Sequence, residues 1–349
     1  MSAAATMFGG TVVANVVIDP QHILGTGLLG PSHLPNDRYF RFKHYLAAAD
    51  RYDGLAFGSS RGPIVPDETM SRHMRGATFA TFSVYAGTIS DHLAVLDYAV
   101  RTRGGTGNGI RAVFLLLDAD IFGLRQLSNQ AMHTLWHPVM MGEDAHRFKW
   151  RYVTAIQPTA WSATVRFAWS HWRYGTQPPR WVIQLAKPAV PPKRPEPAPE
   201  QGNSEANEAS AVPPPAPEVV QKRQRVITSA AFVRARPDFG RQLALLRRFV
   251  EICRANDIKL VVALSPLHRK NAARFDPEEL DVVAQMIGEI VPVWAFGSPA
   301  WLSERADWWH DLSHYTGAVQ AMMMARIFGL PTARADFGRL IGRNGAMRQ

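Results

Sequence analysis

Three side chains from distant parts of the sequence have the chemistry of a nucleophilic site. Ser60 lies in the segment LAFGSSRG at residues 55–62, and Asp311 and His314 lie in the segment DLSH. A serine hydroxyl becomes a nucleophile when a histidine takes its proton and a carboxylate orients the imidazole. Each short segment alone is also typical of turns and helix caps, so the prediction depends on the fold bringing them together.

The elements that must position these residues form an alternating pattern. Short apolar runs rich in β-branched residues predict strands; they lie at residues 53–60, 77–87, 110–120, 258–266 and 290–298. Helical patterns lie between them, at residues 90–103, 238–257 and 276–290. Asp276 is the expected N-cap of the third helix and Pro277 its first residue. The alternation predicts an α/β fold, a doubly wound, flavodoxin-like parallel sheet with helices on both faces.

Ser60 directly follows the first predicted strand, which places it at the carboxyl edge of the sheet. In open α/β sheets ligands bind at this edge, and a backbone N–H there can stabilise an oxyanion. His268 follows the fourth strand at the same edge, where substrate contact and an ordinary surface position are both open. His310 is a rival of His314 for the role of base.

A serine after the first strand, a glycine after the second and Asp-x-x-His after the last together resemble the SGNH, or GDSL-type, hydrolase family. The chain is similar in particular to the membrane-associated branch of polysaccharide and cell-wall acyl-transfer proteins, whose first block often reads GSS. The segments NVVIDPQHI and NDRYFRFKHYL before the first strand also look like that branch. The resemblance covers roughly residues 12–120 and 226–330.

The resemblance implies a role for each matching residue. Ser60 would be the nucleophile, His314 the general base and Asp311 the residue that orients it. Gly87 in the segment SVYAGT would supply a backbone N–H to the oxyanion hole beside that of Ser60; from the residues alone, an ordinary turn glycine is equally open.

The third family block, Gly-x-Asn-Asp, has no match after the third strand. The segment LLLDADIFG offers Asp118 and Asp120 there, and an ionised carboxylate accepts hydrogen bonds but cannot donate them. Arg61, next to the serine, could supply the missing donor, and a solvated surface position is equally open.

The resemblance implies acyl transfer through a serine ester. The acyl group would pass to water, as in an esterase, or to a sugar hydroxyl, as in an O-acetyltransferase acting on a cell-envelope or exopolysaccharide glycan. Neither a metal nor a cofactor is expected. The alternative is a non-catalytic envelope protein that keeps the fold and binds glycan or a membrane acyltransferase partner, which Asp118 modestly favours. A soluble lipase-like esterase is a third possibility.

Composition limits the partners. The formal net charge of +10 favours acidic surfaces such as anionic lipid headgroups or glycans. The cations are scattered and form no basic stripe interleaved with aromatics, so nucleic-acid binding is not predicted. The single cysteine, Cys253, excludes a disulfide framework. Residues 1–18 carry no charged side chain and are a possible N-terminal membrane segment, or else a buried apolar element. The first interpretation predicts a membrane-anchored protein on the periplasmic or extracytoplasmic side.

The chain is therefore expected to form one SGNH-like domain in two parts. The segments in order are 19–185, a disordered Pro/Ala/Glu-rich loop at 186–223, 224–330 and a tail at 331–349. The first part includes an aromatic-rich insertion at 121–185. Its aromatics could line an acceptor groove or lie at a membrane interface. We favour simple packing of a helical insertion onto the sheet.

Overall fold

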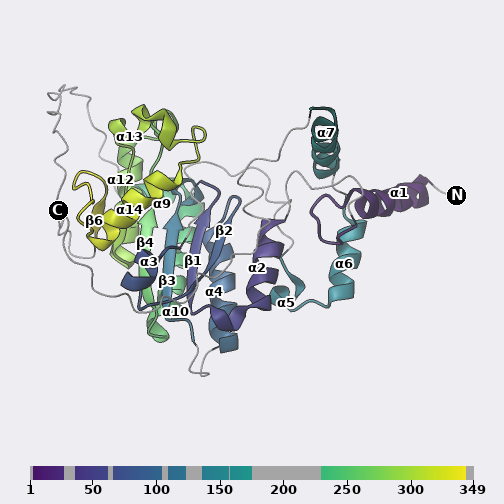
Figure 1. The fold of residues 1–349 in the computed structure, drawn as a ribbon, viewed down its shortest axis with the longest axis horizontal. Helices are drawn as coiled ribbons and strands as arrows, with labels where there is room; N and C mark the ends of the chain where they lie inside the picture. Colours follow the sequence, from purple (N-terminus) through teal and green to yellow (C-terminus); the bar gives the residue numbers. More distant parts are fainter. Residues whose placement is uncertain are drawn as a thin grey trace, which may run out of the picture.

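A six-stranded sheet is the centre of the protein (Figure 1). The computed structural model describes residues 3–26, 36–61, 66–103, 109–122, 136–156, 158–174 and 229–342. The predicted disordered loop at 186–223 lies outside these residues. The strands are β1 (Gly54–Ser59), β2 (Phe79–Val84), β3 (Ala112–Leu117), β4 (Lys259–Leu264), β5 (Val293–Ala295) and β6 (Arg339–Ile341).

The strands lie in the order β2-β1-β3-β4-β5-β6. The first five run parallel, and β6 pairs antiparallel with β5. Chain order reverses between β1 and β3, as it does in doubly wound sheets, where this point is a preferred ligand site. The predicted α/β fold with a parallel sheet is thus confirmed for β1 to β5.

Each face of the sheet packs on its own layer of helices, because successive side chains of a strand point to opposite faces. Leu55 and Phe57 of β1 belong to one buried cluster and Ala56 to the other. The first face is covered by α4 (Ile89–Arg103), α10 (Pro237–Ala255) and α12 (Pro277–Ile290). The second carries α3 (Glu68–His73) and α14 (Gly317–Phe328). Strand β3 is buried along its whole length, as expected of a central parallel strand.

The predicted helices at 90–103, 238–257 and 276–290 correspond to α4, α10 and α12. Asp276 caps α12 by accepting a hydrogen bond from the Glu278 N–H, and Pro277 is the first helical residue, as predicted. Helix α2 (Asp37–Ala47) contacts β2 at the edge of the sheet. The shorter helices are α9 (Ser229–Ala235), α11 (Arg269–Ala272), α13 (Ala300–Glu304) and the 3-10 turns Ala49–Arg51, Ala119–Phe122 and Ala306–Trp308.

Three helices form an arm that stands away from the sheet, beyond α2 (Figure 1). The arm consists of α1 (Ala3–Ile18), α6 (Ala145–Thr154) and α7 (Pro158–Tyr174), and α5 (Pro138–Met141) lies between it and α4. Asn15 of α1 is fully buried and joins the three helices: its side-chain amide donates to the carbonyls of Val153 and Ala155, each at 2.8 Å, and accepts from the Trp161 indole at 2.7 Å.

The arm changes one expectation. The insertion is helical in its described parts, as predicted, but α6 and α7 pack on α1 rather than on the sheet. This packing could not be predicted from sequence, because Asn15, which joins α1 to α6, only indicates that an apolar helix is interrupted by a polar residue. Among the residues described, no helix has the length and apolar character needed to cross a membrane.

The segment predicted as a tail also contributes to the fold. Arg339–Ile341 forms β6, with Trp294 of β5 opposite Leu340. The connection requires a glycine: Gly338 has a φ of +81°, and a Cβ at this position would lie 2.7 Å from the Phe296 ring. A three-residue apolar run is too short to be recognised as a strand from sequence, and the pairing with β5 stabilises it.

Candidate active site

The fold brings Ser60, His314 and Asp311 into one hydrogen-bonded chain. Ser60 follows β1, and the other two lie in the loop before α14, 254 residues from Ser60 to His314. The His314 Nε2 lies 3.3 Å from the Ser60 Oγ, and its Nδ1 lies 2.7 Å from Asp311 Oδ2. A serine–histidine contact of this length is usual for a site without substrate. If Nδ1 carries the proton that Asp311 accepts, Nε2 is left to accept the Ser60 hydroxyl proton.

Asp311 is fixed by its own loop. Its Oδ1 accepts the backbone N–H groups of Ser313 at 2.7 Å and His314 at 2.9 Å, which is the hydrogen-bonding pattern of an Asx turn. Partial burial acts to raise the pKa of this carboxyl, but the hydrogen bonds from Ser313 and His314 outweigh it and hold the pKa below its ordinary value. Asp311 is therefore ionised at neutral pH and accepts the imidazole N–H as an anion.

The loop that carries Asp311 and His314 closes on itself and on Arg61, two residues after the end of β1. The His310 N–H donates to the His314 carbonyl at 2.8 Å, and the Tyr315 N–H donates to the Arg61 carbonyl at 3.2 Å. Trp309 and Tyr315 form an antiparallel bridge at the base of the loop. The His310 side chain is exposed, and His314 is the histidine in contact with Ser60. The geometry therefore supports His314 over His310 as the base.

Two residues of the neighbouring connection support this loop. The buried Asn271 donates from its side-chain amide to the Leu312 carbonyl and to Ser313 Oγ, the latter at 2.9 Å. His268 caps α11 and packs edge-on against Trp309, with ring centres 5.0 Å apart. Burial lowers the pKa of His268, and the positive charges of Lys270 and Arg269 lower it to a smaller extent. His268 was predicted to lie at this edge, whereas nothing in the sequence around Asn271 indicated its role.

Gly87 lies beside the end of β1, but its N–H has another partner. A Cβ at this position would meet the Gly58 carbonyl oxygen at 2.8 Å, so the close approach of the two segments requires a glycine. The Gly87 N–H donates to the Val84 carbonyl at 3.0 Å. This N–H thus belongs to a turn after β2, the alternative that the sequence left open. The turn depends on tertiary packing against β1, which the local sequence does not reveal.

A polar cluster lies beneath the serine. The Arg61 Nε is 4.0 Å from Asp118 Oδ2, and both side chains are largely buried. Burial strongly raises the pKa of the Tyr315 phenol. The phenol has Ser265 as a hydrogen-bonding partner and interacts electrostatically with Asp118 and Arg61. Arg61 is therefore not a solvated surface side chain, which was one of the two positions that the sequence left open. The cluster connects the ends of β1, β3 and β4 with the residue that follows His314.

Strand register explains why these side chains meet. Phe57 of β1 is opposite Leu115 of β3, and Leu117 of β3 is opposite Leu264 of β4. Continued past the strand ends, the same register places Ser60, Asp118 and Ser265 in one row. Ser60 and Asp118 thus follow the two strands between which the chain order reverses, the preferred ligand site of doubly wound sheets.

Comparison of the chain with protein-family models, with curated proteins and with solved structures gives no match. Within the ranges that the structure describes, no three His, Cys, Asp or Glu side chains gather as a metal site would require.

Proposed function

We propose that this protein is a serine-dependent acyl-transfer enzyme of the SGNH-like type. The single observation that carries the proposal is the hydrogen-bonded chain Ser60–His314–Asp311 at the carboxyl edge of the sheet. A hydroxyl, an imidazole and an ionised carboxylate in this order are the components of a serine nucleophile with its base and orienting group.

The reaction proceeds in two steps. The Ser60 Oγ attacks the carbonyl carbon of an ester while His314 Nε2 takes the hydroxyl proton. Collapse of the tetrahedral intermediate breaks the bond to the alkoxide, which takes this proton from His314 and departs as an alcohol, while the acyl group remains on Ser60 as an ester. His314 then takes a proton from water or a sugar hydroxyl, whose oxygen attacks the acyl carbonyl carbon. Collapse of the second intermediate breaks the Ser60 ester, and His314 returns the proton to the Ser60 Oγ. Asp311 stabilises the imidazolium in both steps, and the Ser60 N–H is the expected oxyanion donor.

The proposed substrate is an acylated glycan of the cell envelope or an exopolysaccharide, with water or a glycan hydroxyl as acceptor. The support is the resemblance to the membrane-associated acyl-transfer branch together with the net charge of +10, which attracts anionic glycans. No cofactor is required for this chemistry.

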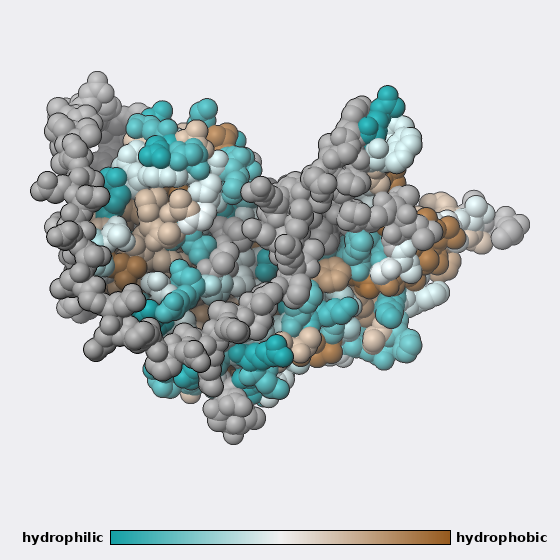
Figure 2. All heavy atoms as spheres, in the orientation of Figure 1, coloured by the Kyte–Doolittle hydropathy of each residue, from teal (hydrophilic) through white to brown (hydrophobic). Residues whose placement is uncertain are grey.

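We also propose that the arm formed by α1, α6 and α7 contacts an anionic membrane surface. Its exposed side chains include Met7 and Val13 of α1, 67% and 62% exposed, and Trp172 of α7, 76% exposed. Figure 2 shows hydrophobic surface over the region of α1. The arm also carries exposed cationic side chains, Lys149 of α6 and Arg166 of α7. Tryptophan together with cationic side chains is typical of segments that lie in a membrane interface.

A second candidate is a non-catalytic envelope protein that binds glycan or a membrane acyltransferase partner. Two observations favour it: the Gly87 N–H is used in a turn, and a carboxylate, Asp118, stands where the family pattern has a donor. Loss of one oxyanion donor costs about 100-fold or more in rate.

The experiment that tests the proposal is labelling with a serine-directed fluorophosphonate, with the modified residue identified by peptide mass. The expected result is an adduct at Ser60 in the wild type and its loss in His314→Ala, with both proteins folded by circular dichroism. A folded wild-type protein without an adduct at Ser60 would instead support the binding-protein candidate.

A further inference from the structure

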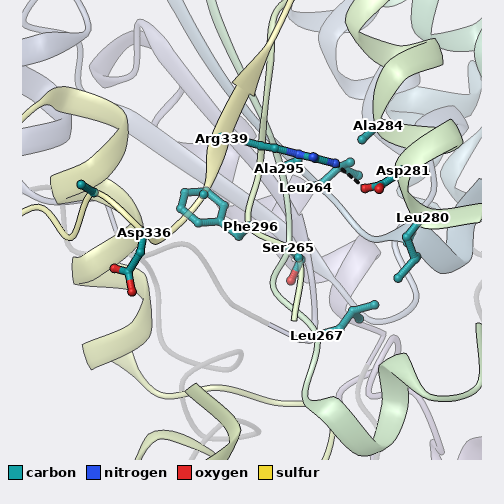
Figure 3. Close-up of a pocket in the computed structure, with 14 residues that line it drawn as sticks. Leu264, Ser265, Leu267, Leu280, Asp281, Ala284, Ala295, Phe296, Asp336 and Arg339 are labelled. Carbon is teal, nitrogen blue, oxygen red and sulfur yellow. Dashed lines mark hydrogen bonds and ion pairs between the residues drawn. The ribbon is translucent and has the colours of Figure 1, made fainter. Parts of the chain in front are cut away.

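A cavity of about 380 Å³ lies at the carboxyl ends of β4 and β5 (Figure 3). Its size is in the range of small-molecule sites in proteins. Its walls come from the ends of β4 and β5, from α12 and from the segment that leads into β6. No residue of the Ser60–His314–Asp311 chain lines it.

The lining is mainly apolar. Aliphatic and aromatic side chains form most of it: Leu264, Leu267, Leu280, Ala284, Ala295 and Phe296. The charged side chains at its wall are paired: Arg339 with Asp281, as the dashed line in Figure 3 shows, and Asp336 with Arg334 at 2.8 Å. Paired charges are poor partners for an ionic ligand, and leucine side chains do not match the polar surface of a sugar. The cavity therefore suits a neutral apolar group.

Two residues of the cavity wall belong to the surroundings of Ser60. Ser265 lines the cavity and is also a hydrogen-bonding partner of Tyr315, the residue after His314. Ala119 lines it and directly follows Asp118, whose carboxylate is 4.0 Å from Arg61. In the register of the sheet, Ser60 and Ser265 are separated by β3 alone, which is about 10 Å at the usual strand spacing.

We propose that this cavity binds the hydrocarbon chain of an acyl group whose ester carbonyl is held at Ser60. The inference rests on the proposed function and adds the substrate class: esters of medium-chain acyl groups, not acetyl esters alone. Burial of methylene groups against the leucines and Phe296 supplies the binding free energy. A hydrocarbon chain that starts at Ser60 must pass Asp118 and Ser265 to reach the cavity. Short acyl groups do not extend this far and therefore gain no binding free energy from it.

The test compares 4-nitrophenyl acetate and 4-nitrophenyl octanoate as substrates of the wild type and of variants that fill the cavity. Ala284→Leu fills it from α12, and Ala335→Phe fills it from an exposed position, where a larger side chain does not threaten folding. Gln285→Leu is the matched control, because Gln285 is exposed on the same helix. We expect both cavity variants to lower kcat/KM for the octanoate by about tenfold or more, while the acetate changes less than twofold and the control behaves as wild type.

A second measurement separates this inference from the proposed function. Binding of 4-nitrophenyl octanoate to the Ser60→Ala protein is followed by calorimetry, with and without Ala284→Leu, and the second substitution should raise Kd about tenfold or more. The inference would be overturned if the ratio of kcat/KM for the octanoate to kcat/KM for the acetate were the same in the wild type and in both cavity variants. The wild type could instead neither hydrolyse esters nor react with the fluorophosphonate, yet bind the octanoate in a way that Ala284→Leu weakens. This result would overturn the proposed function but support the acyl-chain site.

Discussion

Asp311 holds His314 at two points, accepting the imidazole Nδ1–H with one carboxylate oxygen and the backbone N–H of the same residue with the other. The two contacts fix both the position of the residue and the direction of its ring before any substrate arrives. Rotation of the imidazole would break a charge-assisted hydrogen bond, which is stronger than a neutral one. Orientation of the His314 imidazole, the proposed base, is thus built into a turn of four residues.

The first prediction concerns this contact. Asp311→Asn should lower kcat/KM for 4-nitrophenyl acetate by roughly 10³-fold, because an amide no longer stabilises the imidazolium and can favour the wrong tautomer. The melting temperature should change little, since Asp311 is exposed and its Oδ1 can still accept backbone hydrogen bonds. Asp307→Asn is the matched control: it removes an exposed carboxylate from the same region and should leave kcat/KM within twofold. Equal activity of Asp311→Asn and the wild type would argue against Asp311 as the orienting residue.

The residues at the carboxyl edge of the sheet show which parts of the candidate site can be predicted from sequence. The contact of Ser60 with the Asp311–His314 pair could be expected from sequence, because strand ends and Asp-x-x-His are local patterns and the parallel order of strands brings such ends together. The hydrogen bond of the Gly87 N–H could not be decided from sequence, because its direction depends on the turn that packs against Gly58. Asn271 was missed because a buried amide acquires its role from a loop far away in the sequence.

The same distinction applies to larger elements. The helix at 276–290 was recognised with its cap, since Asp276 and Pro277 act within their own turn. The edge strand β6 and the packing of α6 on α1 were not, because both depend on partners distant in sequence: β5 for Arg339–Ile341, and Asn15 for α6. Contacts within one turn can be predicted from sequence, whereas pairing between short distant segments requires the structure.

The second prediction concerns the buried pair of Arg61 and Asp118. Arg61→Met should lower the free energy of unfolding by about 3 kcal/mol, because it leaves the Asp118 carboxylate largely buried without its nearest cation. Addition of Asp118→Leu should recover most of this loss, since the double variant buries neither charge. Urea denaturation of the four proteins gives the coupling free energy.

Arg305→Met is the control for this cycle. Its side chain is more than half exposed and pairs with Asp307 on the surface, where an ion pair contributes at most about 1 kcal/mol. If Arg61→Met costs no more than Arg305→Met, or if the double variant shows no recovery, the Arg61–Asp118 pair does not stabilise the ends of β1 and β3.

The third prediction tests the arm formed by α1, α6 and α7. The protein should co-sediment with vesicles that contain phosphatidylglycerol, and Val13→Asp should weaken this binding roughly tenfold by placing a charge in the apolar contact. Val139→Asp makes the same change at an exposed valine of α5, outside the arm, and should bind as wild type does. Added salt should weaken binding by screening the attraction between cationic side chains and lipid headgroups. Equal binding of the two variants would place the contact elsewhere.

The fourth prediction is a pH dependence of stability that comes from His92. The ring is fully buried on α4 beside Phe57, with centroids 5.1 Å apart. The pKa of His92 is lowered from 6.5 to about 4, mainly by burial; the charge of Asp91 opposes this shift and that of Arg38 adds to it. Between pH 6.5 and 4 the unfolded chain therefore binds a proton that the folded protein does not, so the free energy of unfolding must fall as the pH is lowered through this range.

The His92→Gln variant isolates this contribution, since other groups also titrate. The buried Asp37, whose pKa burial raises, changes stability in the opposite direction, but it does so in both proteins. The loss between pH 7 and pH 4.5 should be smaller in His92→Gln by up to about 3 kcal/mol, by linkage from the two pKa values. His146→Gln removes an exposed histidine and should follow the wild-type curve. Parallel curves for the wild type and His92→Gln would mean that the folded protein protonates His92 as readily as the unfolded chain does.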